Sequence, residues 1–434
     1  MNTKKDIESL KRTERFCAAP WMHLHVQPEG AISPCCMWDY TFERAHPQQY
    51  GDWQDTNNVQ AAMNVPAFQN LRKQLLNNEY QDGCARCYDR EKTVGDSGVD
   101  NFISMRQWFN QRFLDQDMID RTEPDGYLPD ISLKYIDIRF SNICNLKCRM
   151  CGHKLSSTWY DEELKMAELH HHDPPPNKFI QIDAYDDLEP HLETVEEIYF
   201  AGGEPLLYPE HLKILQRLIE LGRTNVDLKY NTNLTSLTYK RVDILELWKK
   251  FDRVQIGASI DATGDTVEYI RTKLNWNKFV ENFDKIKREA PQIDITPSPT
   301  VGILNIEKLP EFECFAWKKG WQTEFSFGLN YVMHPPYLNI YNMPKWYKQE
   351  MTELFEKHLE WCNERNLEPW MTGKIKELIV RLEHDVDDAE VDIQMTTMES
   401  MLNLWDKTGG LDWRASLPHI DRLIAEHKRR KNEK

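Results

Sequence analysis

The sequence lacks long apolar runs and an excess of positive charge. No window holds about 18 consecutive apolar residues, the length that a membrane-spanning helix needs. Residues 1–16 are charged and lack the apolar core of a secretory signal. The formal net charge is −16, and an acidic chain repels the phosphate backbone of nucleic acids. These absences predict a cytoplasmic protein with no membrane partner and no nucleic-acid partner.

The sequence also lacks internal repeats and low-complexity segments, but it contains 10 cysteines. Because reducing conditions in the cytoplasm disfavour disulfides, metal ligation or free thiols are the better interpretation. All but two of the cysteines fall into three tight groups along the chain. The remaining two, Cys314 and Cys362, stand alone and are interpreted as ordinary buried thiols.

The alternation of apolar runs predicts the fold class. From residue 134 onward, β-branched runs alternate with amphipathic helical patterns, which is typical of βα units around a parallel sheet. Expected helices include residues 210–222, 240–250 and 276–289. The expected strands are residues 134–140, 197–201, 227–231, 253–260, 293–301 and 324–331. The pattern predicts an α/β fold with a partial (β/α)6 barrel, whose chemistry lies on the loops after the strands.

At 434 residues the chain exceeds one ordinary domain, and three regions are expected. Residues 1–130 form a small cysteine-rich module, residues 131–344 the partial barrel, and residues 345–434 a charged helical region without evident chemistry. Residues 156–190 form an insertion after the first expected strand. The triple histidine at 170–172 is better interpreted as an exposed loop apex than as a metal site.

The most informative group is Cys144, Cys148 and Cys151, which follows the first expected barrel strand. Three thiolates on one short loop can hold three irons of a four-iron cubane. A closed structural zinc or iron-sulfur site normally takes four protein ligands instead. The loop therefore predicts a cluster with one iron open to another ligand. A zinc knuckle that borrows a distant fourth ligand is the alternative.

This loop resembles the signature of the radical S-adenosylmethionine (SAM) superfamily. The resemblance implies that Cys144, Cys148 and Cys151 are the catalytic ligands of a SAM-binding [4Fe-4S] cluster. It also implies that an electron from this cluster cleaves SAM and produces a 5'-deoxyadenosyl radical. Met150 stands where many members have an aromatic residue, and its side chain still offers an apolar contact.

The ends of the later strands resemble the SAM-binding motifs of the same superfamily. The run Gly202-Gly203-Glu204-Pro205 resembles the motif for the SAM amino group, because a carboxylate accepts hydrogen bonds from an ammonium group. Arg271 is expected to pair with the SAM carboxylate. The full set of expected cofactor-binding residues is Gly202, Gly203, Glu204, Asn231, Asn233, Ser259, Asp261 and Arg271.

The cysteines of the N-terminal module resemble those of a twitch domain, a shortened form of the SPASM accessory domain, placed before the barrel. The resemblance implies an auxiliary [4Fe-4S] cluster. Its expected metal ligands are Cys17, Cys35, Cys84 and Cys87, and the spacing from Gly30 nominates Cys35 over its neighbour Cys36. A structural zinc site made by the same cysteines is the alternative.

Two histidines lie near these cysteines in the sequence. His23 and His25 alternate with apolar residues, which predicts a half-exposed strand rather than metal ligands.

The resemblance implies a radical SAM enzyme that takes a hydrogen atom from a peptide or a small polar metabolite. Its reductant would be a low-potential protein such as flavodoxin or ferredoxin. The auxiliary cluster would transfer an electron or contact the substrate. The rival interpretation is a non-enzymatic iron-sulfur or zinc protein for electron transfer or assembly.

Overall fold

The computed structural model describes residues 6–38, 50–56, 58–97, 104–171, 173–321, 329–367 and 369–433. The chain divides into two compact units, each assembled from separate stretches. Unit 1 comprises residues 1–142, 179–230 and 241–254, and unit 2 comprises residues 143–178, 231–240 and 255–434. Within the described ranges, every helix is too short or too polar to cross a membrane.

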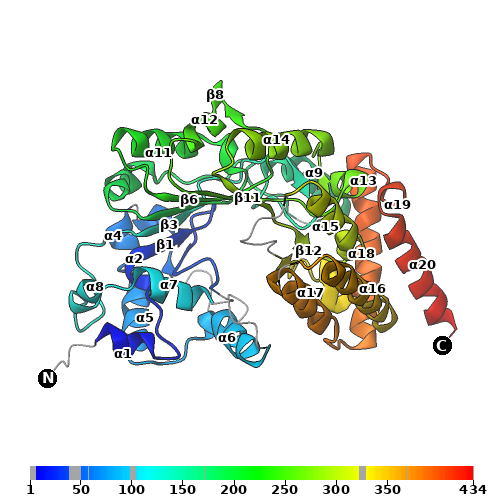
Figure 1. Ribbon diagram of the computed structural model, residues 1–434, viewed down its shortest axis with the longest axis horizontal. Helices are drawn as coiled ribbons and strands as arrows, with labels where there is room; N and C mark the ends of the chain where they lie inside the picture. The colour runs from blue at the N-terminus through cyan, green and yellow to red at the C-terminus, as the bar shows by residue number, and fades with distance from the viewer. Residues whose placement is uncertain are drawn as a thin grey trace. The chain divides into compact units, whose positions relative to one another are not determined.

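Unit 1 is built on a sheet with the strand order β6-β5-β3-β1-β2. Four strands run parallel, and β2 (Ile32–Ser33) is antiparallel to β1. The parallel strands are β1 (His23–Val26), β3 (Tyr135–Ile138), β5 (Glu197–Phe200) and β6 (Asp227–Thr232). Figure 1 shows β1 beside β3. A strand from the cysteine-rich region is therefore part of the same sheet as the first expected barrel strand.

The prediction that β1 is a half-exposed strand is wrong. All four of its side chains are buried. Strands β2 and β3 pair with its two edges, while helix α2 and Phe109 of α7 pack against its side chains. His23 Nδ1 lies 3.0 Å from the carbonyl oxygen of Tyr135, and His25 Nδ1 lies 2.9 Å from Asp137 Oδ2. Both histidines are held by partners within the sheet.

The helices of unit 1 match the sequence pattern where an apolar face is long. Helix α11 (Pro209–Glu220) begins at a proline and buries Ile214, Leu215 and Leu218 on one face. The helix expected at 240–250 begins later, as α12 (Ile244–Trp248), because Lys240 and Arg241 have positive φ angles. The remaining helices are α1 (Ile7–Lys11), α2 (Ala19–Met22), α3 (Trp53–Thr56), α4 (Val59–Ala62), α5 (Pro66–Leu76), α6 (Ala85–Ser97), α7 (Met105–Phe113), α8 (Gln116–Asp120) and α10 (Tyr185–Leu188).

Unit 2 holds the later strands in short pairs. The strands β9 (Val254–Ala258) and β11 (Asp294–Pro297) pair in parallel, as do β12 (Thr300–Val301) and β13 (Asn330–Tyr331). The strand expected at 293–301 is thus split, and most of the one expected at 324–331 lies outside the described residues. An antiparallel pair joins β4 (Lys147–Cys148) to β10 (Arg271–Thr272).

The C-terminal region is helical, as the sequence predicts. Helices α16 and α17 pack against each other, and α18 packs against α9; Figure 1 labels all four. The helices of unit 2 are α9 (Tyr160–His170), α13 (Gly264–Ile270), α14 (Trp276–Glu289), α15 (Leu309–Lys318), α16 (Lys345–Glu364), α17 (Pro369–Leu382), α18 (Asp388–Gly409), α19 (Trp413–Ser416) and α20 (Pro418–Asn432).

The fold class is mixed α/β with parallel strands at its core, as predicted. Two short strands, β7 (Thr238–Tyr239) and β8 (Val242–Asp243), precede α12, and short 3-10 helices join several elements. The apex of the 156–190 insertion is described only in part, because His172 and the side chain of His170 lie outside the described residues. The expected region boundaries at 130 and 344 stay predictions.

Candidate functional site

The loop with Cys144, Cys148 and Cys151 is fixed by backbone hydrogen bonds in unit 2. Cys148 ends strand β4, which pairs with β10. The amide of Cys151 donates to the carbonyl of Cys148 at 2.9 Å and closes a turn between the two thiols. The amide of Leu146 points at the sulfur of Cys144, at 3.5 Å. The structure therefore holds the three predicted ligands on one ordered loop.

The three thiols interact with one another. Cys148 is buried, and the other two are half-buried. A hydrogen bond between the thiols of Cys148 and Cys151 lowers the pKa of Cys148. The same bond raises the pKa of Cys151 well above its usual range, and burial and the charge of Cys144 raise it further. Such mutual influence requires that the three sulfurs lie close together.

An ion pair lies directly beside Cys148. Arg271 donates from Nε and Nη2 to the two carboxylate oxygens of Asp261, at 2.7 and 2.9 Å. Its Nη1 lies 3.7 Å from the sulfur of Cys148. Asp261 also accepts from the amide of Thr300 at 2.9 Å. A fixed positive charge at this distance stabilises a thiolate. The pairing of Arg271 with Asp261 was not predicted from the sequence.

The other expected SAM contacts of unit 2 differ in their surroundings. Asn233 Nδ2 donates to Asn145 Oδ1 at 2.9 Å and lies 3.9 Å from the sulfur of Cys144. Ser259 is half-buried and Asn231 is exposed. The structure thus brings Asn233, Asp261 and Arg271 to the cysteine loop.

The run Gly202-Gly203-Glu204 belongs to unit 1, where it follows strand β5. Gly202 has a φ of +101°, and a Cβ there would lie 2.9 Å from the Cβ of Arg139, so glycine is required. The amide of Gly203 donates to the carbonyl of Ser141 at 3.1 Å. Glu204 is buried and accepts from the amide of Leu206 at 3.2 Å. The contact of these three residues with SAM stays a prediction.

The N-terminal cysteines of unit 1 gather from four elements. Cys17 precedes α2, Cys35 follows β2, Cys84 ends a 3-10 helix (Asp82–Cys84), and Cys87 lies in the first turn of α6. Burial raises the pKa of Cys35 well above its usual range, and the thiols of Cys36, Cys87, Cys17 and Cys84 raise it further. The structure therefore brings the expected auxiliary ligands together.

Cys36 has different neighbours. Burial raises its pKa to about 12, and the strongest charges acting on it are those of Asp137, which raises the pKa, and Arg139, which lowers it. The strongest charges acting on the pKa of Cys35 are instead those of other thiols. This difference favours the nomination of Cys35 as the auxiliary ligand, which stays a prediction.

The donor sets fit iron-sulfur clusters. Burial disfavours thiolate anions, and a bound cationic cluster offsets that cost. Over the described ranges, no three or more His, Cys, Asp or Glu side chains are already arranged around a point where a single metal ion would sit. A four-iron cluster spreads its ligands around a larger object than one ion does.

A support near the auxiliary cysteines was not recognised from the sequence. Arg72 of α5 is fully buried and donates to the carbonyl oxygens of Pro20, Met63 and Gly126, at 2.9, 2.6 and 3.1 Å. It thereby ties α5 to the start of the chain near Cys17. No local pattern distinguishes such an arginine from one with its charge in water.

Two family models match the chain. Residues 138–310 match the model described as the radical SAM superfamily, and residues 17–88 match SPASM, described as an iron-sulfur cluster-binding domain. The SPASM match comes first, in the order that the cysteines predict. The two domains imply a [4Fe-4S] cluster with SAM and auxiliary iron-sulfur chemistry. No curated protein sequence matches the chain.

Solved structures show distant likenesses. One is native anSMEcpe with bound AdoMet and a Cp18Cys peptide, at 16% identity and a TM-score of 0.34, covering 52% of this chain and 59% of that one. Another is Streptococcus suis SuiB bound to S-adenosylmethionine, at 13% identity and a TM-score of 0.35, covering 69% of this chain and 62% of that one. The chain thus covers less than two thirds of the length of either protein.

Proposed function

Because the chain carries a radical SAM domain preceded by a SPASM domain, which indicates an enzyme, we propose that it cleaves SAM and takes a hydrogen atom from a peptide or small polar metabolite. The observation that supports this is the loop with Cys144, Cys148 and Cys151, whose three thiols lie close together. Three protein sulfurs leave one iron of a cubane for a small chelator. When bound, the cluster supplies the electron that converts SAM to methionine and a 5'-deoxyadenosyl radical.

The protein side chains position SAM. Glu204 accepts hydrogen bonds from its ammonium group, beside the backbone of Gly202 and Gly203. Arg271 makes two contacts with Asp261 and one with Cys148. Its remaining N–H groups donate to the SAM carboxylate. The polar groups proposed to hold the ribose are Asn231, Asn233 and Ser259.

The auxiliary site has a separate role. Cys17, Cys35, Cys84 and Cys87 would hold a second [4Fe-4S] cluster, which would supply electron transfer from the substrate or a direct contact to it. A low-potential protein such as flavodoxin or ferredoxin delivers electrons to the enzyme. The support is the grouping of these thiols in unit 1, of which Cys17 and Cys87 are buried and Cys35 and Cys84 half-buried.

Anaerobic reconstitution tests the function. With dithionite and SAM, the reconstituted protein should release 5'-deoxyadenosine and methionine, and Cys148→Ala should abolish this release. Cys362→Ala is the matched control, because Cys362 is also a buried thiol but lies in α16. Iron and sulfide analysis separates clusters from zinc. Protein with both clusters verified and no 5'-deoxyadenosine would leave the non-enzymatic interpretation.

The hydrogen-atom step has its own readout. Deuterated candidate substrates, tested as peptides and as small polar metabolites, should transfer deuterium into 5'-deoxyadenosine. Transfer from only one class identifies the substrate class, and no transfer from any candidate despite SAM cleavage would contradict the proposed substrate range.

A further inference from the structure

Arg149 stands between Cys148 and Met150 in the cysteine loop, and its side chain is buried at 1% exposure. Among the residues that the structure describes, none accepts a hydrogen bond from its three guanidinium nitrogens. Its guanidinium instead lies over the rings of Trp159, Tyr269 and Trp405, at 5.5, 5.0 and 4.9 Å from their centroids. Arginine usually keeps its charge in water. The enclosure of this charge therefore needs an explanation.

The three rings form a cage that is bonded to the cysteine loop itself. Trp159 donates from Nε1 to the carbonyl of Cys148 at 3.2 Å. The amide of Arg149 donates to the carbonyl of Ile270 at 2.8 Å, next to the ring of Tyr269. Trp159 thus holds the backbone of Cys148, and Tyr269 lies in α13 just before strand β10, which pairs with Cys148. Movement of the cage would move the loop.

One buried carboxylate also pairs with the cations on both sides of Cys148. Glu162 of α9 is 3% exposed and lies 3.5 Å from Arg149 Nη1. It also forms an ion pair with Lys147. Removal of a charge from such a buried group leaves its partners uncompensated. The backbone at Cys148 is therefore held between two side chains that share one anchor.

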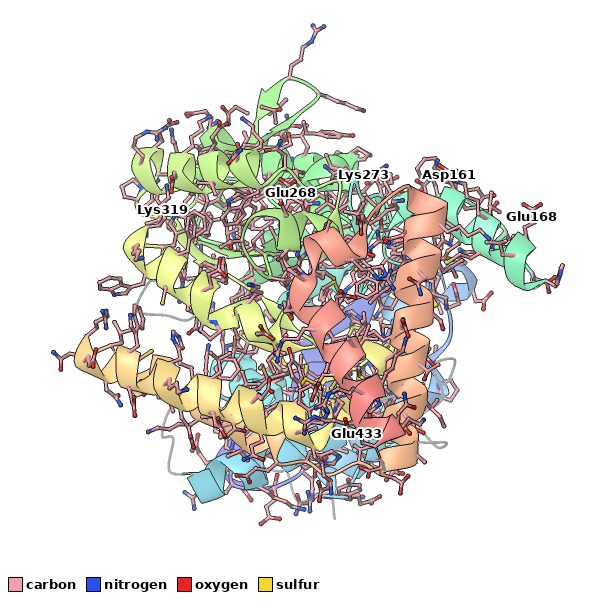
Figure 2. The ribbon with its side chains drawn as sticks, turned by 90° about the vertical axis from the view of Figure 1, so that its right-hand side faces the viewer. Asp161, Glu168, Glu268, Lys273, Lys319 and Glu433 are labelled. Carbon is pink, nitrogen blue, oxygen red and sulfur yellow. The ribbon has the colours of Figure 1, made fainter. Side chains whose placement is uncertain are left out.

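This anchor and the cage both depend on helix α18 of the C-terminal region. Trp405 belongs to α18, and Thr408 donates to Glu162 Oε1 at 3.0 Å. Tyr269 donates to Asp406 of the same helix at 3.0 Å. Figure 2 shows the end of α18 beside the start of α9, where Asp161 is labelled. The C-terminal region thus supports the loop through three residues, Trp405, Asp406 and Thr408, that lie within about one turn of α18.

We propose that Arg149 and Trp405 are positioning residues of the catalytic centre. The cage holds the turn from Cys148 to Cys151 in the geometry that directs the thiols to the cluster, and helix α18 is part of the catalytic apparatus. The inference rests on the proposed function for the identity of the cluster. It assigns a role to the C-terminal region, in which the sequence shows no chemistry.

A second consequence concerns charge. The guanidinium of Arg149 is enclosed by rings and lies one residue from Cys148, so solvent screens it poorly. A positive charge near a cluster favours its reduced state. Loss of this charge should therefore make the catalytic cluster harder to reduce, whereas loss of a cage ring alone should mainly loosen the loop.

The test compares four variants with a matched control. Arg149→Met removes the charge, Arg149→Lys retains it, Trp405→Leu removes a ring face, and Trp405→Phe retains one. The control is Trp321→Leu, because Trp321 is also buried in unit 2 but stacks on Phe283, with ring centroids 4.1 Å apart. Trp405→Leu and Trp321→Leu should both lower thermal stability, so stability alone does not decide.

Three readouts distinguish positioning from bulk stability. In the apoprotein, hydrogen exchange of the amides from Cys148 to Cys151 should accelerate in Trp405→Leu and Arg149→Met but not in Trp321→Leu. In the reconstituted protein, these two variants should alter the electron paramagnetic resonance of the SAM-bound reduced cluster. They should release 5'-deoxyadenosine about 10- to 100-fold more slowly, the usual effect of losing a partner of a metal ligand. Trp405→Phe, which keeps a ring face, should resemble the wild type in amide exchange, resonance and rate of 5'-deoxyadenosine release.

The two proposals fail differently. Wild-type protein that holds no catalytic cluster, or does not cleave SAM, overturns the proposed function. Active wild-type protein overturns the positioning role if Trp405→Leu and Arg149→Met match Trp321→Leu in exchange, resonance and rate. If Arg149→Met lowers the reduction potential while Trp405→Leu leaves exchange unchanged, Arg149 acts by charge alone, and the role of α18 is excluded.

Discussion

The buried ion pair beside Cys148 ties the stability of unit 2 to its chemistry. Asp261→Asn leaves the guanidinium of Arg271 buried, with no full charge to balance it. Breaking one side of a buried pair costs about 3–5 kcal/mol. We expect the free energy of unfolding of the apoprotein to fall by about this amount, as measured by urea denaturation.

A double variant serves as the control for this prediction. Asp261→Leu with Arg271→Met removes both charges, so it should recover much of the stability but none of the SAM cleavage. An Asp261→Asn protein as stable as the wild type would show that the pair is not buried as the structure has it.

His211 should make unit 1 sensitive to acid. Its Nε2 lies 3.0 Å from the hydroxyl oxygen of Tyr230, and burial lowers the pKa of His211 from 6.5 to about 3. Between these two values the unfolded chain binds the proton and the folded chain does not. The stability from the neutral histidine is therefore complete above pH 6.5 and is lost as the pH falls toward 3.

The contribution of His211 can be isolated with a double variant. Between about pH 7 and about pH 5, its titration should cost about 2 kcal/mol. His211→Phe with Tyr230→Phe removes the titrating group and its hydroxyl partner, so the variant should lose this share of the pH dependence of the urea midpoint. An unchanged pH dependence would mean that the pKa of His211 is the same in the folded and unfolded protein.

At the residue scale, the sequence predicted those groupings whose members lie close together in the chain. The spacing of Cys144, Cys148 and Cys151 is visible within one loop, so their grouping needed no knowledge of the fold. Arg271 and Asp261 were each nominated, but their pairing depends on how a helix returns to strand β10. Arg149 was not nominated, because Trp405 is distant in the sequence and an arginine on a loop is usually solvated.

Among the elements, the 3-10 helix that ends at Cys84 packs tightly on an aromatic ring. A Cβ on Gly83 would lie 2.2 Å from the indole of Trp38, which is buried at 4% exposure. Gly83→Ala should therefore displace the ring or the helix and cost about 1–3 kcal/mol. It should also lower the iron retained by the auxiliary site, as measured by iron and sulfide content.

A compensating substitution tests the cause of this effect. Trp38→Leu in the Gly83→Ala background frees space for the added methyl group, so iron retention should recover in part. If the double variant retains no more iron than Gly83→Ala alone, crowding against Trp38 is not the reason.

Elements with a long apolar period were predicted best. The helix expected at 276–289 is α14 (Trp276–Glu289), and the strand expected at 197–201 is β5 (Glu197–Phe200). The helix expected at 240–250 starts late because its first residues form a turn with positive φ. The alternation in β1 indicated one exposed face, but helix α7, which lies far along the chain, covers side chains there, with the ring of Phe109 5.1 Å from that of His23.

On the scale of the whole molecule, the chain returns repeatedly to each of its two units. The sequence indicated a separate module at residues 1–130, because this region precedes the first expected barrel strand and holds cysteines, tryptophans and turn signals. Long-range strand pairing is not encoded in composition or local period, so this arrangement could not be predicted from the pattern. This long-range strand pairing decides which fragments can fold alone.

A pair of fragments tests this. Residues 1–130 contain β1 but lack β3, so β1 would expose an unpaired edge, and we expect this fragment to aggregate or remain unfolded. Residues 1–254 contain every stretch of unit 1 and should show cooperative unfolding by circular dichroism. A cooperatively folded 1–130 fragment would establish an independent N-terminal domain.

The parallel pairing of β1 with β3 also sets an order of events during synthesis. His25 and its partner Asp137 are 112 residues apart, so β1 leaves the ribosome long before its neighbour exists. Contacts of such long range form late and slowly. The first cysteines of the nascent chain therefore remain free thiols until β3 has been translated. The auxiliary site can bind its cluster only after nearly a third of the protein has been synthesised.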